Sequence, residues 1–361
     1  MERPLNEKKR IDRALRILKK EKIEAFLIND LTDIRYLSGF TGDEASALIA
    51  TEALFLLVDS RFTTQAKLET RLFQPIKISK RIEDTIKLIN RLRVKKVGFD
   101  AKTTSYADFK ELEKGLSGTT LIPIEERLHP LRMKKEKEEI KVLRLAIAIS
   151  TQGFQKMKEK IKFGVTEKEI AIAYESAVKE AGADKLSFDT IVASGVRSAL
   201  PHGVASGKKI GPRELVMMDF GVQYQGYYSD ETCTVVTGTP TPKQKEVYNI
   251  VKTAHDRAID RIKPGVSSQE VDKTARGYIE KKGFAKYFGH GTGHGVGMSL
   301  HEEPRISPLK NVILEEGMVF TIEPGIYLPN WGGVRIEDMI VVTRDACEVL
   351  TLAPKNLEIN N

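Results

Sequence analysis

The chain has 361 residues, of which 41% are hydrophobic and 30% charged, and its formal net charge is +8, which is typical of a soluble globular protein long enough for two domains. No apolar run approaches the length of a membrane span, residues 1–10 lack the apolar core of a signal peptide, and the two cysteines, Cys233 and Cys347, exclude a disulfide framework, so we expect a cytoplasmic protein that does not bind membranes. Specific nucleic-acid binding is not expected either, because the lysines alternate with acids, as in residues 134–139, and no zinc-finger spacing or aromatic-basic RNA motif is present.

The first part of the chain has the pattern of a separate α/β domain. Residues 7–22 have helical periodicity, and two further helical stretches follow near residues 62–72 and 82–92. Short apolar runs that predict strands lie at residues 25–28, 47–50, 54–58 and 96–99. We find no cluster of metal-ligand or catalytic residue types in this part, so the chemistry is expected in the remainder of the chain.

A domain boundary is expected near residues 125–133. His129 and Pro130 interrupt the pattern there, and a long, charged helix is predicted over about residues 135–161. We therefore divide the chain into a first domain at residues 1–128 and a second at residues 129–361.

The second part contains an internal repeat. Residues 162–170 resemble residues 263–271, and each segment predicts a helix start with a capping box, in which Ser or Thr and a following Glu satisfy each other's backbone donors. The two boxes pair Thr166 with Glu169 and Ser267 with Glu270. Both predicted helices run to a glycine suited to the left-handed conformation, Gly182 and Gly283. The repeat predicts two halves with the same order of helix and hairpin.

Two pairs of acidic residues follow the repeated helices at nearly the same step. Asp219 and Asp230 flank a turn-like segment, residues 221–226, and Glu323 and Glu337 flank a longer one. Each acid stands in or beside an apolar, β-branched run that predicts a strand, so a hairpin would bring the two members of each pair together. A single acid at a strand end is usually a cap or half of an ion pair, but buried carboxylates need a partner or a metal.

His294 lies between the two acid pairs, in the glycine-rich segment 289–297. Four carboxylates and one imidazole would suit two divalent cations. Phosphate binding by this segment is not favoured, because no Lys-Ser or Lys-Thr pair ends it.

At these motifs the chain closely resembles the pita-bread metallopeptidases, and within them the Xaa-Pro group of prolidases and aminopeptidase P-like enzymes. The matching segments are residues 33–42, 192–202, 218–221, 228–230, 289–302, 322–325 and 335–337. The resemblance covers nearly the full length and implies an α/β (α+β) fold, with a creatinase-type N-terminal α/β domain in residues 1–128. A pita-bread catalytic domain with a pseudo-twofold internal repeat would follow in residues 129–361. Methionine aminopeptidases usually lack such an N-terminal domain and fit less well.

The resemblance also implies a ligand set. The metal ligands would be Asp219, Asp230, His294, Glu323 and Glu337. They would hold two divalent ions per chain, with Mn or Co favoured and Zn or Fe possible. Such a site acidifies a water molecule that attacks the scissile carbonyl, and Glu323 corresponds to the acid that carries the water's proton to the leaving nitrogen.

The resemblance implies substrate contacts for four further residues. His202 and His301 correspond to non-ligand histidines that hydrogen-bond the substrate or the tetrahedral intermediate, and we include both among the catalytic residues. Arg305 and Arg335 correspond to substrate-binding positions, and Arg305 would meet the free carboxylate of a dipeptide through two parallel hydrogen bonds. Arg305 could equally pair with one of the two glutamates that shortly precede it.

Other motif-adjacent residues have a structural interpretation. His290 is either a support for the site or purely structural, and His129 and His255 are expected at the surface. Cys233 stands where the Xaa-Pro group often has arginine, which leaves the ligand set intact but changes the packing or charge beside it.

We therefore predict a dinuclear metal-dependent exopeptidase that hydrolyses amino-terminal Xaa-Pro bonds, favoured as an Xaa-Pro dipeptidase. An aminopeptidase P-like enzyme acting on longer peptides is the close alternative. Two other classes are a non-catalytic pita-bread binding protein and a metal-free hydrolase like creatinase, and the complete ligand set argues against both. The expected partners are proline-containing di- or oligopeptides, and the resemblance suggests a homodimer.

Overall fold

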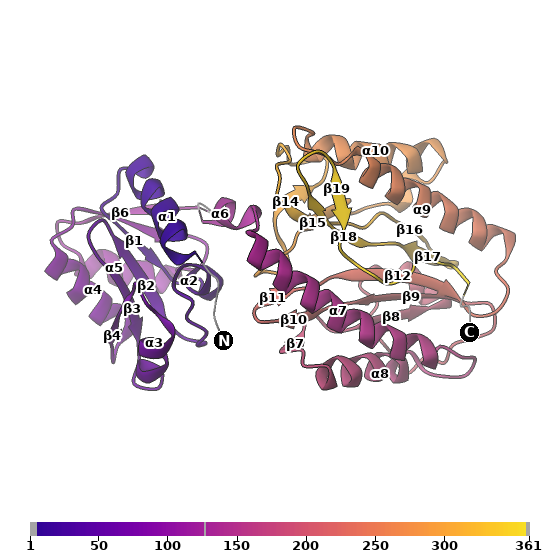
Figure 1. Ribbon diagram of the computed structural model, residues 1–361, viewed down its shortest axis with the longest axis horizontal. Coiled ribbons are helices and arrows are strands. Elements are labelled where there is room, and N and C mark those ends of the chain that lie inside the picture. The colour runs from indigo at the N-terminus through magenta and orange to yellow at the C-terminus, as the bar shows by residue number, and fades with distance from the viewer. Residues whose placement is uncertain (1–5, 126–127, 359–361) are drawn as a thin grey trace. The chain divides into compact units, whose positions relative to one another are not determined.

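Figure 1 shows the computed structural model, which describes residues 6–125 and 128–358. The chain forms two compact units, Met1–Arg132 and Met133–Asn361. The division predicted after residue 128 stays a prediction, and the first five residues of the polar segment 1–10 lie outside the described part. No helix within the described residues is long and apolar enough to cross a lipid bilayer.

The N-terminal unit is built on a six-stranded mixed sheet in the order β4-β3-β2-β1-β5-β6. Its strands are β1 (Ala25–Ile28), β2 (Ser46–Ala50), β3 (Leu54–Val58), β4 (Gln74–Lys77), β5 (Lys96–Asp100) and β6 (Thr120–Ile124). β1 pairs antiparallel with β2 and parallel with β5. Every residue of β1 and β2 is buried, as expected for central strands that are covered on both faces.

Five helices of this unit pack around the sheet. They are α1 (Glu7–Glu21), α2 (Leu31–Ser38), α3 (Thr63–Glu69), α4 (Arg81–Leu92) and α5 (Tyr106–Gly115). α4 and α5 bury Leu88 and Leu112 in one core with Leu27 of β1. Phe26 and Ile28, which point to the opposite face of β1, are buried as well, so neither face of the sheet is left open.

The predicted strands at residues 25–28 and 54–58 are confirmed, and those at 47–50 and 96–99 each differ by one residue. β4 and β6 were not predicted, nor were α2 and α5. Both missed strands lie at sheet edges, are partly exposed and contain a proline, Pro75 or Pro123, so neither has a continuous apolar run. α2 has only 8 residues, too few for clear helical periodicity.

The C-terminal unit places its strands between two pairs of long helices (Figure 1). After the short α6 (His129–Met133), α7 (Lys137–Lys160) packs with α8 (Glu167–Glu180), and α9 (Pro242–Arg261) packs with α10 (Ser268–Lys281). One core joins α7 and α8 to the first group of strands through Tyr174 and Phe220. A second core joins α9 and α10 to the later strands through Ile279 and Phe320. The two halves of this unit therefore repeat one arrangement.

Antiparallel strands fill the space between these helix pairs. The groups are β12-β9-β8, β11-β10-β7, β14-β13-β15-β18-β19 and β16-β17. The strands are β7 (Lys185–Leu186), β8 (Ile191–Ser194), β9 (Leu215–Phe220), β10 (Val222–Tyr224), β11 (Tyr227–Tyr228), β12 (Glu231–Val236), β13 (Gly293–Gly295), β14 (Glu302–Ile306), β15 (Val319–Ile322), β16 (Gly325–Leu328), β17 (Gly332–Arg335), β18 (Asp338–Val342) and β19 (Cys347–Val349). The Glu337 N–H donates to the Thr232 carbonyl at 3.1 Å, so the two halves meet side by side.

The repeated helix starts are confirmed in most respects. Thr166 caps α8, and the Glu169 carboxylate accepts the Thr166 N–H at 2.8 Å, which completes the first capping box. Each repeated helix is followed by a glycine with positive φ, Gly182 (96°) and Gly283 (84°). The prediction of the second capping box is only half right. The Ser267 hydroxyl accepts the Glu270 N–H and caps α10, but the Glu270 carboxylate binds Arg261 instead of the Ser267 N–H.

The first predicted hairpin is formed by β9 and β12. Their register sets Asp219 opposite Thr232, and Asp230 lies two residues closer to the turn on the same face. Gln225 and Gly226 form the turn of this hairpin, and their φ angles are 49° and 85°. Positive φ at both central residues is typical of a two-residue hairpin turn.

The second predicted hairpin is formed by β15 and β18 and extended by β16 and β17. β15 and β18 pair Ile322 with Asp338, and this register continues through the next residues to set Glu323 opposite Glu337. Asp219 lies in β9 and the other three acids lie beside strand ends, so the members of each pair face each other across a hairpin, as the spacing predicts.

Candidate metal centre

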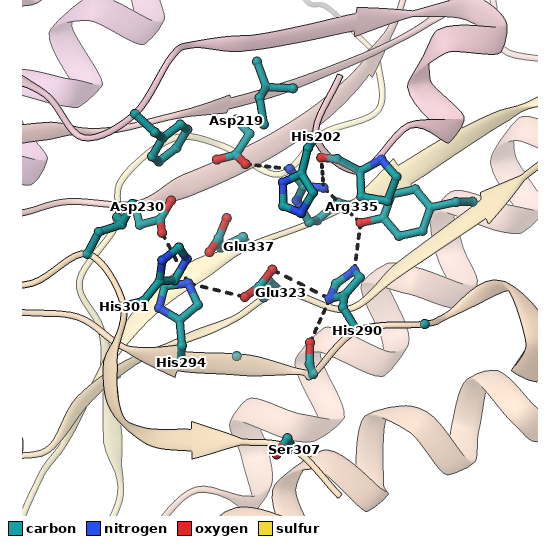
Figure 2. Close-up of a pocket in the computed structure, with 18 of the residues that line it drawn as sticks. His202, Asp219, Asp230, His290, His294, His301, Ser307, Glu323, Arg335 and Glu337 are labelled. Carbon is teal, nitrogen blue, oxygen red and sulfur yellow. Dashed lines mark hydrogen bonds and ion pairs between the residues drawn. The ribbon is translucent and has the colours of Figure 1, made fainter. Parts of the chain in front are cut away.

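A cavity of about 820 Å³ is lined by residues of both hairpins and of the glycine-rich segment (Figure 2). Every site residue predicted from the sequence lines it: His202, Asp219, Asp230, His294, His301, Arg305, Glu323, Arg335 and Glu337. The structure therefore gathers residues from distant parts of the C-terminal unit into one site.

Strand alternation points the acids into this cavity. Asp230 lines the cavity, whereas its neighbour Glu231 faces the opposite side of β12 and binds Lys355. The second hairpin follows the same rule, with Glu337 toward the cavity and Asp338 toward Lys355. The site therefore has an inner layer of candidate ligands and an outer layer of buried charge.

Three candidate ligands form the tightest cluster. Asp230, His294 and Glu337 each offer one ligand atom, and these atoms lie within 4.8 Å of one another. The His294 Nε2 atom lies 3.5 Å from Asp230 Oδ2 and 3.5 Å from Glu323 Oε1 (Figure 2). One imidazole nitrogen thus stands among carboxylate oxygens from both hairpins.

The orientation of His294 leaves that nitrogen free to bind a cation. Its Nδ1 atom lies 3.1 Å from the Gly295 carbonyl oxygen, which can only accept, so Nδ1 carries the hydrogen. Burial and the neighbouring His301 lower the pKa of His294 to about 3. The imidazole is therefore neutral at pH 7, with the Nε2 lone pair directed at the acids, which is the form that binds metals.

The four acids are crowded by negative charge. Burial, together with the nearby carboxylates, raises the pKa of Asp230 and of Glu337 well above the usual values, and burial raises the pKa of Glu323 to about 7. Asp219 Oδ1 is buried and has no hydrogen-bond partner within the described residues. Cations held here would relieve the repulsion and bind this oxygen, so the residues fit divalent metal ions.

Arg335 joins the two hairpins. Its Nη2 donates to Asp219 Oδ2 at 2.6 Å, its Nη1 to the Tyr327 hydroxyl at 2.9 Å and the Pro201 carbonyl at 3.0 Å, and its Nε to the Thr232 hydroxyl at 3.0 Å. These partners hold the guanidinium at the cavity wall. Its expected contact with substrate stays a prediction.

His290 supports this arrangement from the other side of the cavity. Its Nδ1 lies 2.8 Å from the Gly291 carbonyl oxygen, so Nε2 accepts from the Tyr327 hydroxyl at 2.9 Å (Figure 2). Burial and Arg335 lower the pKa of His290 to about 4, which keeps the ring neutral. Of the two interpretations left open for His290, these contacts favour a support for the site.

Sequence reasoning missed Tyr327 and Thr232. The Thr232 hydroxyl donates to Glu337 Oε2 at 2.7 Å, and Tyr327 links Arg335 to the opposite wall. Strand periodicity was the available signal, because Thr232 is two residues after Asp230 and Tyr327 is four after Glu323.

The two non-ligand histidines lie beside the candidate ligands. The His301 and His294 rings are 4.3 Å apart between centroids and meet edge to face. Burial and Arg305 lower the pKa of His301. His202 lines the same cavity from the loop after β8. Each imidazole has an N–H group that can donate a hydrogen bond to a ligand in the cavity.

Arg305 has no competing partner. Within residues 6–125 and 128–358, its guanidinium forms no hydrogen bond or ion pair. Neither of the two glutamates considered as alternatives binds the guanidinium: Glu302 pairs with Lys135 at 2.6 Å, and Glu303 lies 3.8 Å from Lys310 and accepts only the backbone N–H of Arg305, at 2.9 Å. Arg305 is therefore free to hold an anionic group of a ligand.

Behind the ligands lies a buried ionic cluster around Lys355. Its Nζ binds Glu231, lies 3.0 Å from Asp338 Oδ1 and lies 3.6 Å from Cys233 Sγ. Burial raises the pKa of Cys233 to about 12, so this thiol stays protonated. Lys355, from the C-terminal segment, places a positive charge beside the position that is often arginine in the Xaa-Pro group.

The expectation that His255 lies at the surface is wrong. Its side chain lies on the inner face of α9 and is 2% exposed. His255 Nδ1 is 3.0 Å from Asp256, and Nε2 is 3.1 Å from Asp338. Burial opposes its charge, but hydrogen bonds to these two acids raise the pKa of His255. A histidine outside a motif is thus part of the outer ionic layer.

Lys355→Met is expected to destabilise the protein by about 3–5 kcal/mol, because it leaves the buried carboxylate of Glu231 without its cation and removes the ammonium group from Asp338, which keeps its contact with His255. Urea unfolding measures the change. Lys156→Met is the control, since the Lys156 side chain forms an exposed pair with Glu159 and no other ion pair in the part of the chain that the structure describes, and this change should alter stability by less than about 0.5 kcal/mol. Equal effects of the two changes would contradict the buried role of Lys355.

Comparison with known proteins adds to this geometry. Residues 141–344 match metallopeptidase family M24, and residues 10–134 match the creatinase/prolidase N-terminal domain. An Xaa-Pro dipeptidase of Pyrococcus horikoshii is 38% identical, over 98% of this chain and 99% of its own.

Two solved structures are similar at nearly full length. An Xaa-Pro dipeptidase from Bacillus anthracis gives a TM-score of 0.95 at 38% identity and covers 98% of this chain and 99% of its own. An X-Pro aminopeptidase from Thermotoga maritima gives a TM-score of 0.89, also at 38% identity, and covers 96% and 99%.

Proposed function

The chain belongs to metallopeptidase family M24, with a creatinase/prolidase N-terminal domain ahead of a pita-bread catalytic domain, and from this membership we propose that it hydrolyses Xaa-Pro dipeptides. The observation that carries the proposal is one cavity that holds both a cluster of metal-type ligands and the Arg305 guanidinium, which has no hydrogen bond or ion pair within the described residues. The ligands suit peptide-bond hydrolysis, and Arg305 suits the carboxylate of a short substrate.

The proposed ligands are Asp219, Asp230, His294, Glu323 and Glu337. Two divalent ions bound by them would supply the Lewis acidity that activates a water molecule near neutral pH. The predicted Mn or Co suits this set, as Zn or Fe does, because it consists of carboxylates and one imidazole. The family requires divalent metal, and the number and identity of the ions are part of the proposal.

The side chains divide the remaining steps. Glu323, which lines the cavity beside the other candidate ligands, would accept a proton from water and deliver it to the proline nitrogen as the bond breaks. His202 and His301 donate hydrogen bonds to the carbonyl oxygen as negative charge develops on it. Arg335 holds the Asp219 carboxylate and the Pro201 carbonyl in place through its hydrogen bonds to both.

The proposal also includes a cytoplasmic location, a homodimer and a second candidate activity. Cys233 and Cys347 are both free thiols, which suits a reducing cytoplasm. A homodimer is proposed from the family resemblance. Cleavage of longer peptides is the second candidate activity, because the similar Thermotoga maritima protein is an X-Pro aminopeptidase.

Peptide length separates these two activities. The metal-loaded protein is expected to hydrolyse Xaa-Pro with a higher kcat/KM than Xaa-Pro-Yaa. Arg305→Ala should lower kcat/KM for the dipeptide about 10- to 100-fold, the value of a lost charge-assisted pair, and leave the tripeptide nearly unchanged. A dipeptide alone places its carboxylate at a fixed reach from the scissile bond.

Arg305→Lys is the matched control, because it keeps the charge and loses the two-pronged geometry, and an intermediate loss is expected. The measurement is the ratio of kcat/KM for the two substrates in each variant. An unchanged ratio would remove Arg305 as the carboxylate site and favour the aminopeptidase activity.

A further inference from the structure

Glu167, outside the cavity, binds both ends of the loop that carries His202. It is the first residue of α8, and its side chain is fully buried. Oε1 accepts the Ser194 N–H at 2.7 Å and the Ser194 hydroxyl at 2.9 Å. Oε2 accepts the Ser206 N–H at 3.1 Å, the Ser206 hydroxyl at 2.6 Å and Arg197 Nε at 3.0 Å. One carboxylate therefore binds both ends of the loop, Ser194 and Ser206.

The loop between these two serines forms part of the cavity wall. Pro201, His202 and Val204 line the cavity, and beyond the short helical turn Gly195–Ala199 this loop contains no helix or strand of its own. Arg197 extends the clamp, because its Nη2 donates to the Val204 carbonyl at 2.7 Å while its Nε binds Glu167. Apart from one isolated backbone bridge between Ile191 and Val204, the charged cluster is therefore what holds this segment among the described residues.

The same loop contacts the second hairpin. The Pro201 carbonyl accepts from Arg335 Nη1 at 3.0 Å, and the Ser198 hydroxyl accepts from the Gly333 N–H at 2.8 Å. The approach is close, since a Cβ atom on Gly333 would lie 2.3 Å from the Ser198 carbonyl oxygen. Figure 2 shows His202 in the cavity with Arg335. The position of His202 thus depends on a loop fitted between Glu167 and the hairpin.

The second half of the repeat shows what a purely structural anchor looks like. Ser268 occupies the same first position in α10, where its hydroxyl accepts the Val312 N–H at 3.0 Å and donates to the Lys310 carbonyl at 3.2 Å. None of residues 308–313, all of which the structure describes, lines the cavity. A serine is enough for that loop, whereas the His202 loop has a buried carboxylate, which is costly unless its hydrogen bonds are satisfied.

We propose that Glu167 is a positioning residue for the reaction, which holds His202 where its imidazole donates to the reacting carbonyl. The inference rests on the proposed function of His202. Glu167→Gln keeps the size of the side chain but replaces one acceptor oxygen with an NH₂ group that faces hydrogen-bond donors. The loop is then expected to shift or loosen, and a misplacement of about 1 Å can cost up to about 100-fold in rate.

The test is a double-variant cycle on the metal-loaded protein with an Xaa-Pro dipeptide as substrate. Glu167→Gln should lower kcat about 10- to 100-fold and leave the bound metal unchanged. In a His202→Ala background the same change should cost less than about twofold, because the imidazole that Glu167 positions is already absent. If Glu167→Gln lowers kcat by the same factor in the His202→Ala background as in the unchanged protein, the inference is overturned.

A matched control separates positioning from helix stability. Glu169 belongs to the same first turn of α8, is exposed and binds only Thr166 within the described residues. Glu169→Gln weakens the capping box without touching the loop, so kcat should stay within about twofold of the unchanged protein. Glu167→Asp, which keeps the charge on a shorter side chain, is the second variant and is expected to lose less than Glu167→Gln.

Hydrogen exchange gives a readout that does not depend on substrate. Glu167→Gln should speed amide exchange across residues 194–206 and leave residues 289–301 unchanged. If the unchanged protein does not cleave Xaa-Pro, the proposed function fails, and the exchange rates still decide whether Glu167 holds the loop. Unchanged exchange at residues 194–206 would overturn the inference even in an active peptidase.

Discussion

Removal of bound divalent metal by a chelator is expected to abolish Xaa-Pro hydrolysis, with a loss on the order of 1000-fold or more, and added Mn²⁺ or Co²⁺ should restore it. The reason is the composition of the cavity. Asp230 and Glu337 are buried and Glu323 is half-buried beside them, all three with raised pKa values, and Asp219 has a buried oxygen without a partner in the described residues. None of these groups alone makes water nucleophilic at neutral pH.

The measurement is dipeptide cleavage before chelation, after chelation and after metal is returned, with metal content followed by elemental analysis. Circular dichroism is the control, because the chelated protein must remain folded for the loss to be chemical. Full activity in a folded preparation shown to be free of metal would exclude the proposed mechanism. Mg²⁺ tests the ligand preference, since the imidazole of His294 favours transition metals over a cation that prefers oxygen.

His294→Ala should lower metal occupancy more than any other single histidine change. The His294 Nε2 is the one nitrogen of the three-residue cluster with Asp230 and Glu337. Changes in residues that only support a ligand typically cost 10- to 100-fold in metal affinity, so loss of the ligand itself should cost at least about 100-fold. Activity at limiting metal should fall by the same factor and recover in part when metal is in excess.

His301→Ala is the matched comparison, because the two rings lie 4.3 Å apart and both are neutral in the same cavity. This variant should keep its metal and lose about 100-fold in kcat, the usual effect of removing one donor to a developing oxyanion. Titration of each variant with Mn²⁺ and measurement of kcat at saturation separate the two effects. Equal loss of metal in both would contradict the division between ligand and donor.

Local patterns in the chain predict much of this site. Period-two alternation makes each acid part of a strand face, and the repeated helix starts indicate that two hairpins come from equivalent halves. Both features act over a few residues, so they are readable without coordinates. The structure confirms the two predicted hairpins. Asp219 lies opposite Thr232 in the first, and the register of the second sets Glu323 opposite Glu337.

Contacts between distant segments were not predictable in this way. His255 is buried against Asp338, and Lys355 reaches Glu231 from the C-terminal segment, because α9 and residues 350–358 pack on the back of the sheet. Neither His255 nor Lys355 belongs to the repeated segments or to a motif, so no pattern in the sequence links either residue to its acidic partner. Such pairings are selected by which partner satisfies a buried charge once the chain has folded.

The sequence by itself determined the two domains' α/β character, the paired hairpins and the identity of the candidate ligands, since helix starts, strand alternation and residue chemistry are local properties. Only the tertiary structure decided that the Arg305 guanidinium has no partner among the described residues, that Tyr327 joins Arg335 to His290, and that Glu167 binds both ends of the His202 loop. Hydrogen bonds and ion pairs require particular atoms within about 3 Å, and packing of remote segments alone sets those distances.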